Sequence, residues 1–99
     1  MKLRELAHSR TGDKGNMVNL SVIAYREQDF PLLLEKVTEK KVREHFRGIV
    51  HGEVKRYVLP NIHALNFVLC DALAGGVTRS LALDKHGKSF SSALLDMEI

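Results

Sequence analysis

Apolar and polar residues alternate most regularly between residues 17 and 25 of the chain. The apolar positions 18, 20, 22 and 24 are separated there by Asn19 and Ser21, and this period of two predicts a half-buried β-strand. The other face of the same strand becomes apolar at Ile23 and Tyr25. We therefore expect the far end of this strand to be covered on both faces.

Three other segments predict strands. Residues 53–59 alternate in the same way and end at Pro60, which cannot donate to a sheet ladder. Residues 77–83 alternate again, and the short mixed segment 2–8 predicts a first strand at the start of the chain.

The segment from Asp29 to His45 predicts two short helices. Asp29 favours an N-cap and Pro31 fits a first helical turn, where the missing N–H costs nothing. Apolar residues recur at helical spacing up to Val37, and those that follow fall out of phase with them. Because Thr38 is a suitable second N-cap, we expect the two helices to meet there. Residues 47–52 then form a connector, either a lid or a packed loop, and residues 89–97 predict a short terminal helix.

The segment Asn61–Leu73 predicts a helix that is apolar almost all round, closed by Gly75 and Gly76. A helix of this kind must be covered on both sides, and a small domain has little second layer for that purpose. We expect it to form an interface with a second copy or with another protein; the alternative is a central helix between the sheet and the terminal helix. Asn66 lies in its middle, either as a ligand-binding amide or as a structural amide with satisfied hydrogen bonds.

Together these segments predict a single domain over residues 1–99 in which strands and helices are mixed along the chain, in the order β-β-α-β-α-β-α. A content of 44% hydrophobic and 27% charged residues is ordinary for a globular domain. No apolar run has the length of a membrane span, and the first residues do not resemble a secretory signal. The lone Cys70 fits a reducing compartment, so we expect a cytoplasmic protein without membrane contact.

The formal net charge of +3 does not by itself indicate nucleic-acid binding. Basic residues of segment 35–44 are interleaved with glutamates, which is typical of a solvated helix face, and the chain has no Trp for base stacking. The five histidines show no HxxxH or HxH spacing. We expect no nucleic-acid partner, no metal and no cofactor.

The segment Arg10–Asn16 (RTGDKGN) combines two glycines with an acid and two bases. Three interpretations stay open: an anion site in which backbone N–H groups form a concave nest, a catalytic loop with Asp13 and Lys14 as acid and base, or the turn of a long hairpin. Arg79 follows on an otherwise apolar strand face, where Asp13, a bound anion or a surface salt bridge would be its partner. The candidate ligand-binding residues are Arg10, Gly12, Asp13, Lys14, Gly15, Asn19, Asn66 and Arg79.

Four segments give a resemblance to a known family. Arg10–Asn16, Arg56–Asn61 (RYVLPN), Ala64–Leu69 (ALNFVL) and Gly75–Leu81 (GGVTRSL) resemble the AtuA-like ferredoxin-fold family, the small C-terminal domain of acyclic terpene utilisation proteins. The resemblance implies a ferredoxin-like α+β fold, a two-layer sandwich with a mixed or antiparallel sheet. It also implies a large AtuA-type subunit as partner, in the bacterial breakdown of acyl-CoA and acyclic terpenoid compounds. It carries no catalytic residues, and the predicted order departs from the simple βαββαβ of ferredoxin-like folds.

The leading expectation is an accessory or partner-binding subunit. Its partner would be a second copy or the large AtuA-type subunit, bound through the Asn61–Leu73 helix. Its polar loop would bind a CoA-type anion, since a CoA thioester carries phosphates. The alternatives are a small stand-alone enzyme acting on an acyl-CoA, with Asp13 or His8 as acid or base, and a purely structural self-associating module. The sequence leaves open whether the protein is an enzyme.

Overall fold

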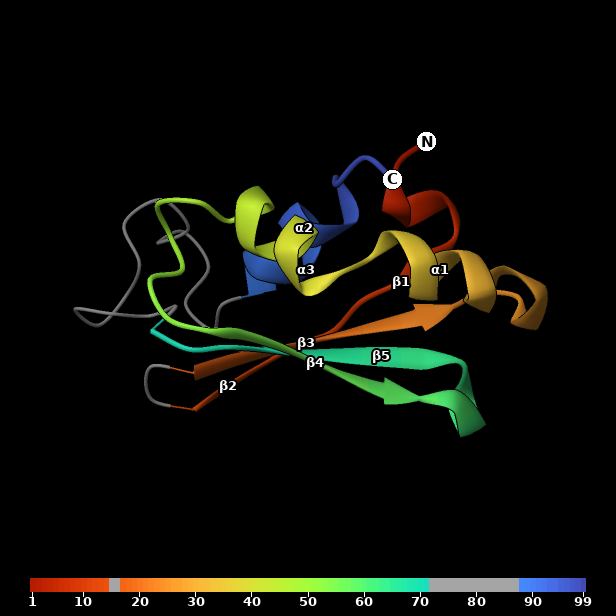
Figure 1. Ribbon diagram of the computed structural model, residues 1–99, viewed down its shortest axis with the longest axis horizontal. Coiled ribbons are helices and arrows are strands. Elements are labelled where there is room, and N and C mark those ends of the chain that lie inside the picture. The colour runs from red at the N-terminus through yellow and green to blue at the C-terminus, as the bar shows by residue number, and fades with distance from the viewer. Residues whose placement is uncertain (15–16, 72–87) are drawn as a thin grey trace.

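The computed structural model describes residues 1–14, 17–71 and 88–99. In this part of the chain a five-stranded antiparallel sheet carries the α-helices on one of its faces (Figure 1). The elements in chain order are η1 (Leu3–Glu5), β1 (Ala7–His8), β2 (Thr11–Lys14), β3 (Met17–Ala24), η2 (Glu27–Asp29), α1 (Phe30–Lys36), α2 (Glu39–His45), β4 (Val54–Leu59), η3 (Pro60–Ile62), β5 (Ala64–Leu69) and α3 (Lys88–Leu95), where η marks a 3-10 helix. The predicted α+β class with an antiparallel sheet is confirmed.

The sheet has the strand order β1-β3-β5-β4, and β2 also pairs with β3. Since β5 occupies one edge of β3, β1 and β2 lie end to end along its other edge, against Ile23–Ala24 and Met17–Leu20. β4 is the outer strand on the far side among the described strands.

The core lies between the sheet and the helices. Alternate residues of β3 and β5 point toward the helices and are buried, as the period of two requires. The largest fully buried side chains are Phe46, Phe67, Phe90, Leu3, Leu20, Leu33, Leu65, Leu69, Leu94, Val18, Val22 and Val37. Of the helices that are described, none is both long and apolar enough to cross a membrane.

Three of the sequence-predicted strands lie in described residues. Those at residues 17–25 and 53–59 are confirmed as β3 and β4. The strand predicted at 2–8 is wrong for most of its length, because the Glu5 carboxylate accepts the N–H of Lys2 at 2.9 Å and closes a helical turn; only Ala7 and His8 join the sheet. Tyr25, expected to be covered, is 62% exposed and stacks on His8.

The two helices predicted to meet near Thr38 are confirmed as α1 and α2. Thr38 Oγ1 accepts the N–H of Lys41 at 3.1 Å, which caps α2. Asp29 precedes α1 without such a bond, because its carboxylate accepts a hydrogen bond from Arg26 Nε at 3.0 Å instead. The terminal helix is confirmed as α3.

The helix predicted at Asn61–Leu73 is wrong. The segment forms η3, a left-handed turn at His63 with φ of 54°, and then the strand β5 in the middle of the sheet. A short apolar run fits a buried helix and a central strand equally well. Here the segment is a strand because it pairs with β3 on one side and with β4 on the other. The order β-β-α-β-α-β-α is therefore corrected to β-β-β-α-α-β-β before α3 over the described residues, and the predicted strand at 77–83 lies outside them.

Candidate functional site

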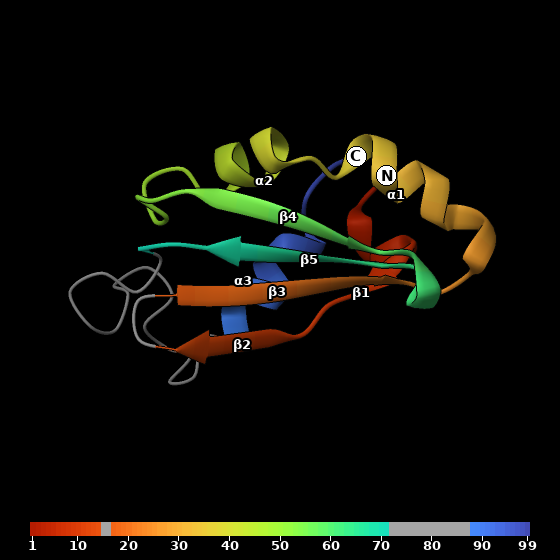
Figure 2. The same ribbon diagram turned by 60° about the horizontal axis from the view of Figure 1, so that its bottom comes forward.

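The face of the sheet opposite the helices is left uncovered by every described helix (Figure 2). Side chains of β3 point to this face from Met17, Asn19, Ser21 and Ile23, since Val18, Leu20 and Val22 point into the core. We call it the open face. Directly opposed residues of neighbouring strands share a face, so the pairing register places the rest of its residues.

The register arranges the open face in three rows across the strands. One row runs Gly12–Asn19–Val68–Lys55, the next Arg10–Ser21–Asn66–Tyr57, and the third His8–Ile23–Ala64–Leu59. The first two rows are mainly polar and lie in the middle and at one end of the sheet, and the third is mainly apolar.

Four of the predicted ligand-binding residues come together in the two polar rows: Arg10, Gly12, Asn19 and Asn66. Arg10 is fixed at the sheet edge by its backbone, because its N–H donates to Ser21 Oγ at 2.9 Å and its carbonyl accepts the N–H of Ser21 at 3.0 Å. Gly12 makes room for its neighbour, since a Cβ there would lie 3.2 Å from Asn19 Oδ1. The Asn19 amide therefore lies over the Gly12 backbone.

Asn66 is half-buried at the centre of the open face, between Ser21 of β3 and Tyr57 of β4. Within the part of the chain that the structure describes, the side-chain amides of Asn19 and Asn66 form no hydrogen bond. Each amide offers a donor and an acceptor. The polar rows thus present two amides that have no hydrogen-bond partner among the described residues, in rows that also contain Arg10.

The other predicted site residues are not brought into these rows. Asp13 pairs with Val18 and Lys14 with Met17, so the glycine segment continues as an extended strand up to Lys14. An extended, paired backbone at Gly12 does not curve into a nest there, and the hairpin interpretation fits residues 11–14. The nest was expected near Gly12 and Gly15 together, and its Gly15 part is not among the described residues. Gly15 and Arg79 lie outside the described residues.

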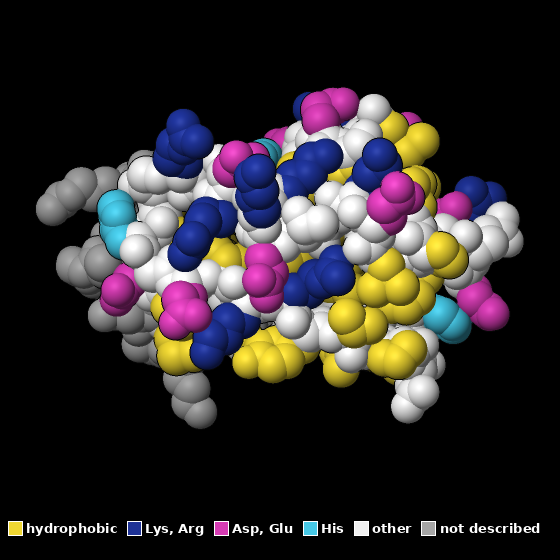
Figure 3. Space-filling model, viewed as in Figure 1, with side chains coloured by type: hydrophobic (Ala, Val, Ile, Leu, Met, Phe, Trp, Pro, Cys, Tyr) yellow, Lys and Arg dark blue, Asp and Glu magenta, His cyan; other side chains and the backbone are white. Residues whose placement is uncertain are grey.

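Sequence reasoning missed the apolar flank of the open face. Tyr57 and Leu59 of β4 are 50% and 42% exposed, and Ile62 in the following turn is 57% exposed. Hydrophobic side chains gather over this end of β4 and the turn that follows it (Figure 3). The alternation of Lys55, Tyr57 and Leu59 in the sequence is the signal that marks them as one face of a strand.

Among the described residues, one carboxyl group has a clearly shifted pKa, and it lies away from the open face. A hydrogen bond from Arg4 lowers the pKa of the Asp96 carboxyl, with Lys2 also nearby. No group of three or more His, Cys, Asp or Glu side chains that could hold a metal ion is found in residues 1–14, 17–71 and 88–99.

Comparison with known proteins identifies the family. The sequence model of the AtuA ferredoxin-like domain matches residues 1–99, the whole of the chain. Searches among curated proteins and among solved structures gave no match. The resemblance of the RTGDKGN and LPN–ALNFVL segments is thereby confirmed, and the sheet with helices on one face agrees with a ferredoxin-like fold. This chain belongs to the AtuA ferredoxin-like domain family.

Proposed function

We propose that this protein is an accessory subunit that binds a large AtuA-type subunit through the open face of its sheet, in a bacterial system that breaks down acyl-CoA or acyclic terpenoid compounds. The observation that carries the proposal is the open face itself, uncovered by the described helices and flanked by exposed apolar side chains. The family supports the kind of partner, because it is named for a domain of AtuA-type proteins.

The composition of the open face suits a protein interface. Tyr57 places a half-exposed aromatic ring next to the central Asn66, and Leu59 and Ile62 extend the apolar surface beyond it. Interfaces that form and dissociate combine an apolar centre with polar groups, and tyrosine is enriched among the residues that dominate binding energy. In this proposal the polar rows set the orientation of the partner, and Tyr57 and Leu59 supply most of the apolar burial.

The test is binding of the wild-type chain and of two variants to the separately purified large AtuA-type subunit, by calorimetry and native mass spectrometry. Tyr57→Glu puts a charge into the proposed interface, and Ser92→Glu adds the same charge to an exposed site on α3 in the helix layer. We expect Tyr57→Glu to lose about 2 kcal/mol or more, roughly a 30-fold rise in Kd, and Ser92→Glu to bind as wild type.

Three outcomes contradict the proposal: no complex with the wild-type chain, equal losses in the two variants, or no loss in Tyr57→Glu. A homodimer that forms without the large subunit and is disrupted by Tyr57→Glu would assign the open face to self-association instead.

We also propose a CoA-type anion as ligand of the polar rows. Arg10 and Lys55 lie in these rows without a carboxylate within 4.0 Å among the described side chains, beside the unbonded amides of Asn19 and Asn66. Coenzyme A titrated into 15N-labelled protein should shift the side-chain amide signals of these two asparagines in a saturable way. Gly12→Ala, whose Cβ displaces the Asn19 amide, should weaken that response. Shifts that do not saturate, or that are the same in Gly12→Ala, would remove the ligand from this site.

A further inference from the structure

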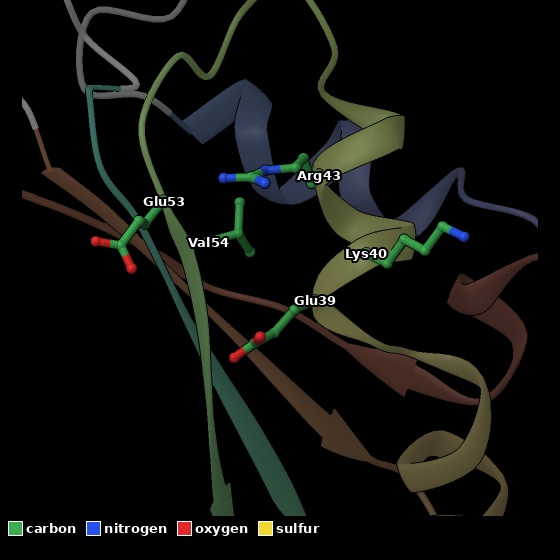
Figure 4. A pocket seen from close by; sticks show the side chains of 5 residues that line it. All are labelled: Glu39, Lys40, Arg43, Glu53 and Val54. Carbon is green, nitrogen blue, oxygen red and sulfur yellow. The ribbon is translucent and has the colours of Figure 1, made fainter.

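The outer edge of β4 is held by two side chains of α2. Glu39 and Arg43, one helical turn apart, both project from α2 toward β4 (Figure 4). Glu39 Oε2 accepts the backbone N–H of Arg56 at 2.8 Å, and the Arg43 guanidinium donates to the backbone carbonyl of Gly52 at 3.3 Å. An edge strand offers its free N–H and C=O groups to any strand that comes alongside. Glu39 and Arg43 thus supply one acceptor and one donor of the kind that a neighbouring strand would supply.

These two side chains leave part of the edge open. Because the N–H of Arg56 points away from β5 toward Glu39, the backbone groups two residues on either side, at Val54 and Val58, point outward as well. No described residue forms a hydrogen bond with the outward groups of Val54 and Val58. The edge therefore presents two free positions about 14 Å apart along β4.

The surface beside these positions is hollowed between α2 and β4. One hollow of about 330 Å³ is lined by Val54 and Glu53 of the β4 segment with Glu39, Lys40 and Arg43 of α2. Another of about 510 Å³ is lined by Arg56 and Val58 of β4 with Thr38, Glu39 and Lys40. Since the two hollows share Glu39 and Lys40, they adjoin along the strand. Together they leave room for an extended backbone beside β4, from Val54 to Val58.

The charges beside the edge distinguish between possible occupants. Glu39 and Glu53 line the same hollow as Lys40 and Arg43, but neither cation has a carboxylate within 4.0 Å in the described part of the chain. An acidic side chain on an incoming segment would supply a close counter-charge. A second copy of β4 would instead bring its own Arg56, with Lys40 and Arg43 of its own α2, to this same side of the joined sheets, while its Lys55 points to the open face. The charges thus favour an acidic segment of a different protein over self-pairing.

We propose that the β4 edge binds an extended, acidic segment of the protein partner by strand addition. The backbone of the segment pairs with Val54 and Val58 and replaces the Glu39 carboxylate at the N–H of Arg56. Main-chain hydrogen bonds supply affinity in this mode of recognition, and side chains at alternate positions supply specificity. The identity of the partner, the large AtuA-type subunit, rests on the proposed function; the edge and its occupant are a separate claim.

The test uses Val58→Pro in the full chain, with the large AtuA-type subunit as the probe. Because the N–H of Val58 points away from β5, proline removes an outward donor and leaves the β4–β5 ladder in place. The matched control is Val58→Thr, which keeps the N–H and the branched side chain. We expect binding to weaken about tenfold or more in Val58→Pro and to stay at the wild-type level in Val58→Thr, with the same circular dichroism spectrum in both.

A second variant tests strand addition at the β4 edge even if Val58→Pro does not fold. Glu39→Ala frees the N–H of Arg56, so the partner segment no longer has to displace a carboxylate, and binding should tighten. Wild-type binding by Val58→Pro, or unchanged or weaker binding by Glu39→Ala, overturns the proposal. If Tyr57→Glu abolishes the complex while Val58→Pro does not, only the edge is refuted; if the wild-type chain forms no complex, the proposed function fails and this proposal with it.

Discussion

The Arg56 side chain joins the sheet to the helix layer. Replacing Arg56 should therefore destabilise the fold more than replacing any exposed lysine or arginine. Its Nη1 donates to the carbonyl of Leu34 at 2.8 Å and to that of Val37 at 2.9 Å, at the C-terminal end of α1. The last carbonyls of a helix have no partner within the helix, and the negative end of the helix dipole favours a cation there. Arg56 therefore satisfies two otherwise unpaired carbonyls with one charged group.

The magnitude follows from these two bonds. A hydrogen bond to a charged group contributes about 1.5–3 kcal/mol, and the low end applies because both bonds share one nitrogen and the site is only partly buried. Arg56→Met keeps the apolar stem and removes both bonds, so the free energy of unfolding should fall by about 2–3 kcal/mol. For a domain of this size the midpoint temperature should fall by about 10–20 °C.

The assay is urea unfolding followed by far-UV circular dichroism, since the chain has no Trp to report by fluorescence. Arg56→Lys is the informative control, because an ammonium keeps the charge at the helix end but lacks the planar fork, and it should lose about half as much. A loss below about 0.5 kcal/mol in Arg56→Met, within the range of an ordinary surface change, would refute the reasoning. So would a loss in Arg56→Lys equal to that in Arg56→Met.

Three further predictions concern single positions. Gly52→Ala should destabilise by about 2–4 kcal/mol in chemical unfolding, because its Cβ would meet the backbone carbonyl oxygen of Cys70 at 2.7 Å and the chain must shift. Asp71→Gly should raise the free energy of unfolding by about 0.5–1 kcal/mol, since Asp71 holds a left-handed φ of 55° that suits glycine; no gain would show that its side chain compensates. Because hydrogen bonding to Arg4 lowers the pKa of Asp96 in the folded state, this group stabilises the fold above its unfolded pKa, and the stabilisation is lost as the pH falls through the folded value. Asp96→Asn should remove that acid-dependent loss in unfolding curves between about pH 5 and 2, and a variant with the wild-type pH profile would contradict the assignment.

The elements that the sequence predicted correctly have local causes. β3 follows from strict alternation, α1 from Pro31 in its first turn, and α2 from the Thr38 cap that the structure contains. Each of these signals acts within a few residues and needs no knowledge of the rest of the chain. The turn at Lys2–Glu5 has a local cause too, but it depends on a side chain of Glu5 that a strand pattern does not reveal.

The segment 64–69 could not be assigned from its own residues. Its alanine, leucines and asparagine do not favour a strand, and its apolar positions suit either a helix or a central strand. The segment forms a strand because it pairs with β3, more than forty residues earlier in the chain, and with β4 on its other side. Such pairing depends on the whole sheet, so no window around Phe67 contains it.

The same pairing explains why the sequence predicts individual residues of the candidate site but not their arrangement. In the sequence, Arg10 is a candidate as part of the glycine segment, and Asn66 is a candidate as a polar residue in an apolar run. The register of β3 places Ser21 opposite both, and so it brings them into one row. The residue types were thus predictable from the sequence, and the row itself was not.

The change from helix to strand also moves the expected partner surface. As a helix, segment 61–73 would be apolar almost all round, and this is the reason to expect an interface there from the sequence. Leu65 and Phe67 are two of its apolar residues. In the strand both point into the core and are fully buried. Asn66, between them, points the other way and lies in the row of Tyr57, whose ring is half-exposed. The apolar surface that needs a partner is therefore provided by β4. Asn66, which the sequence places in an apolar run, lies at the centre of the open face, and we propose that this face binds the partner.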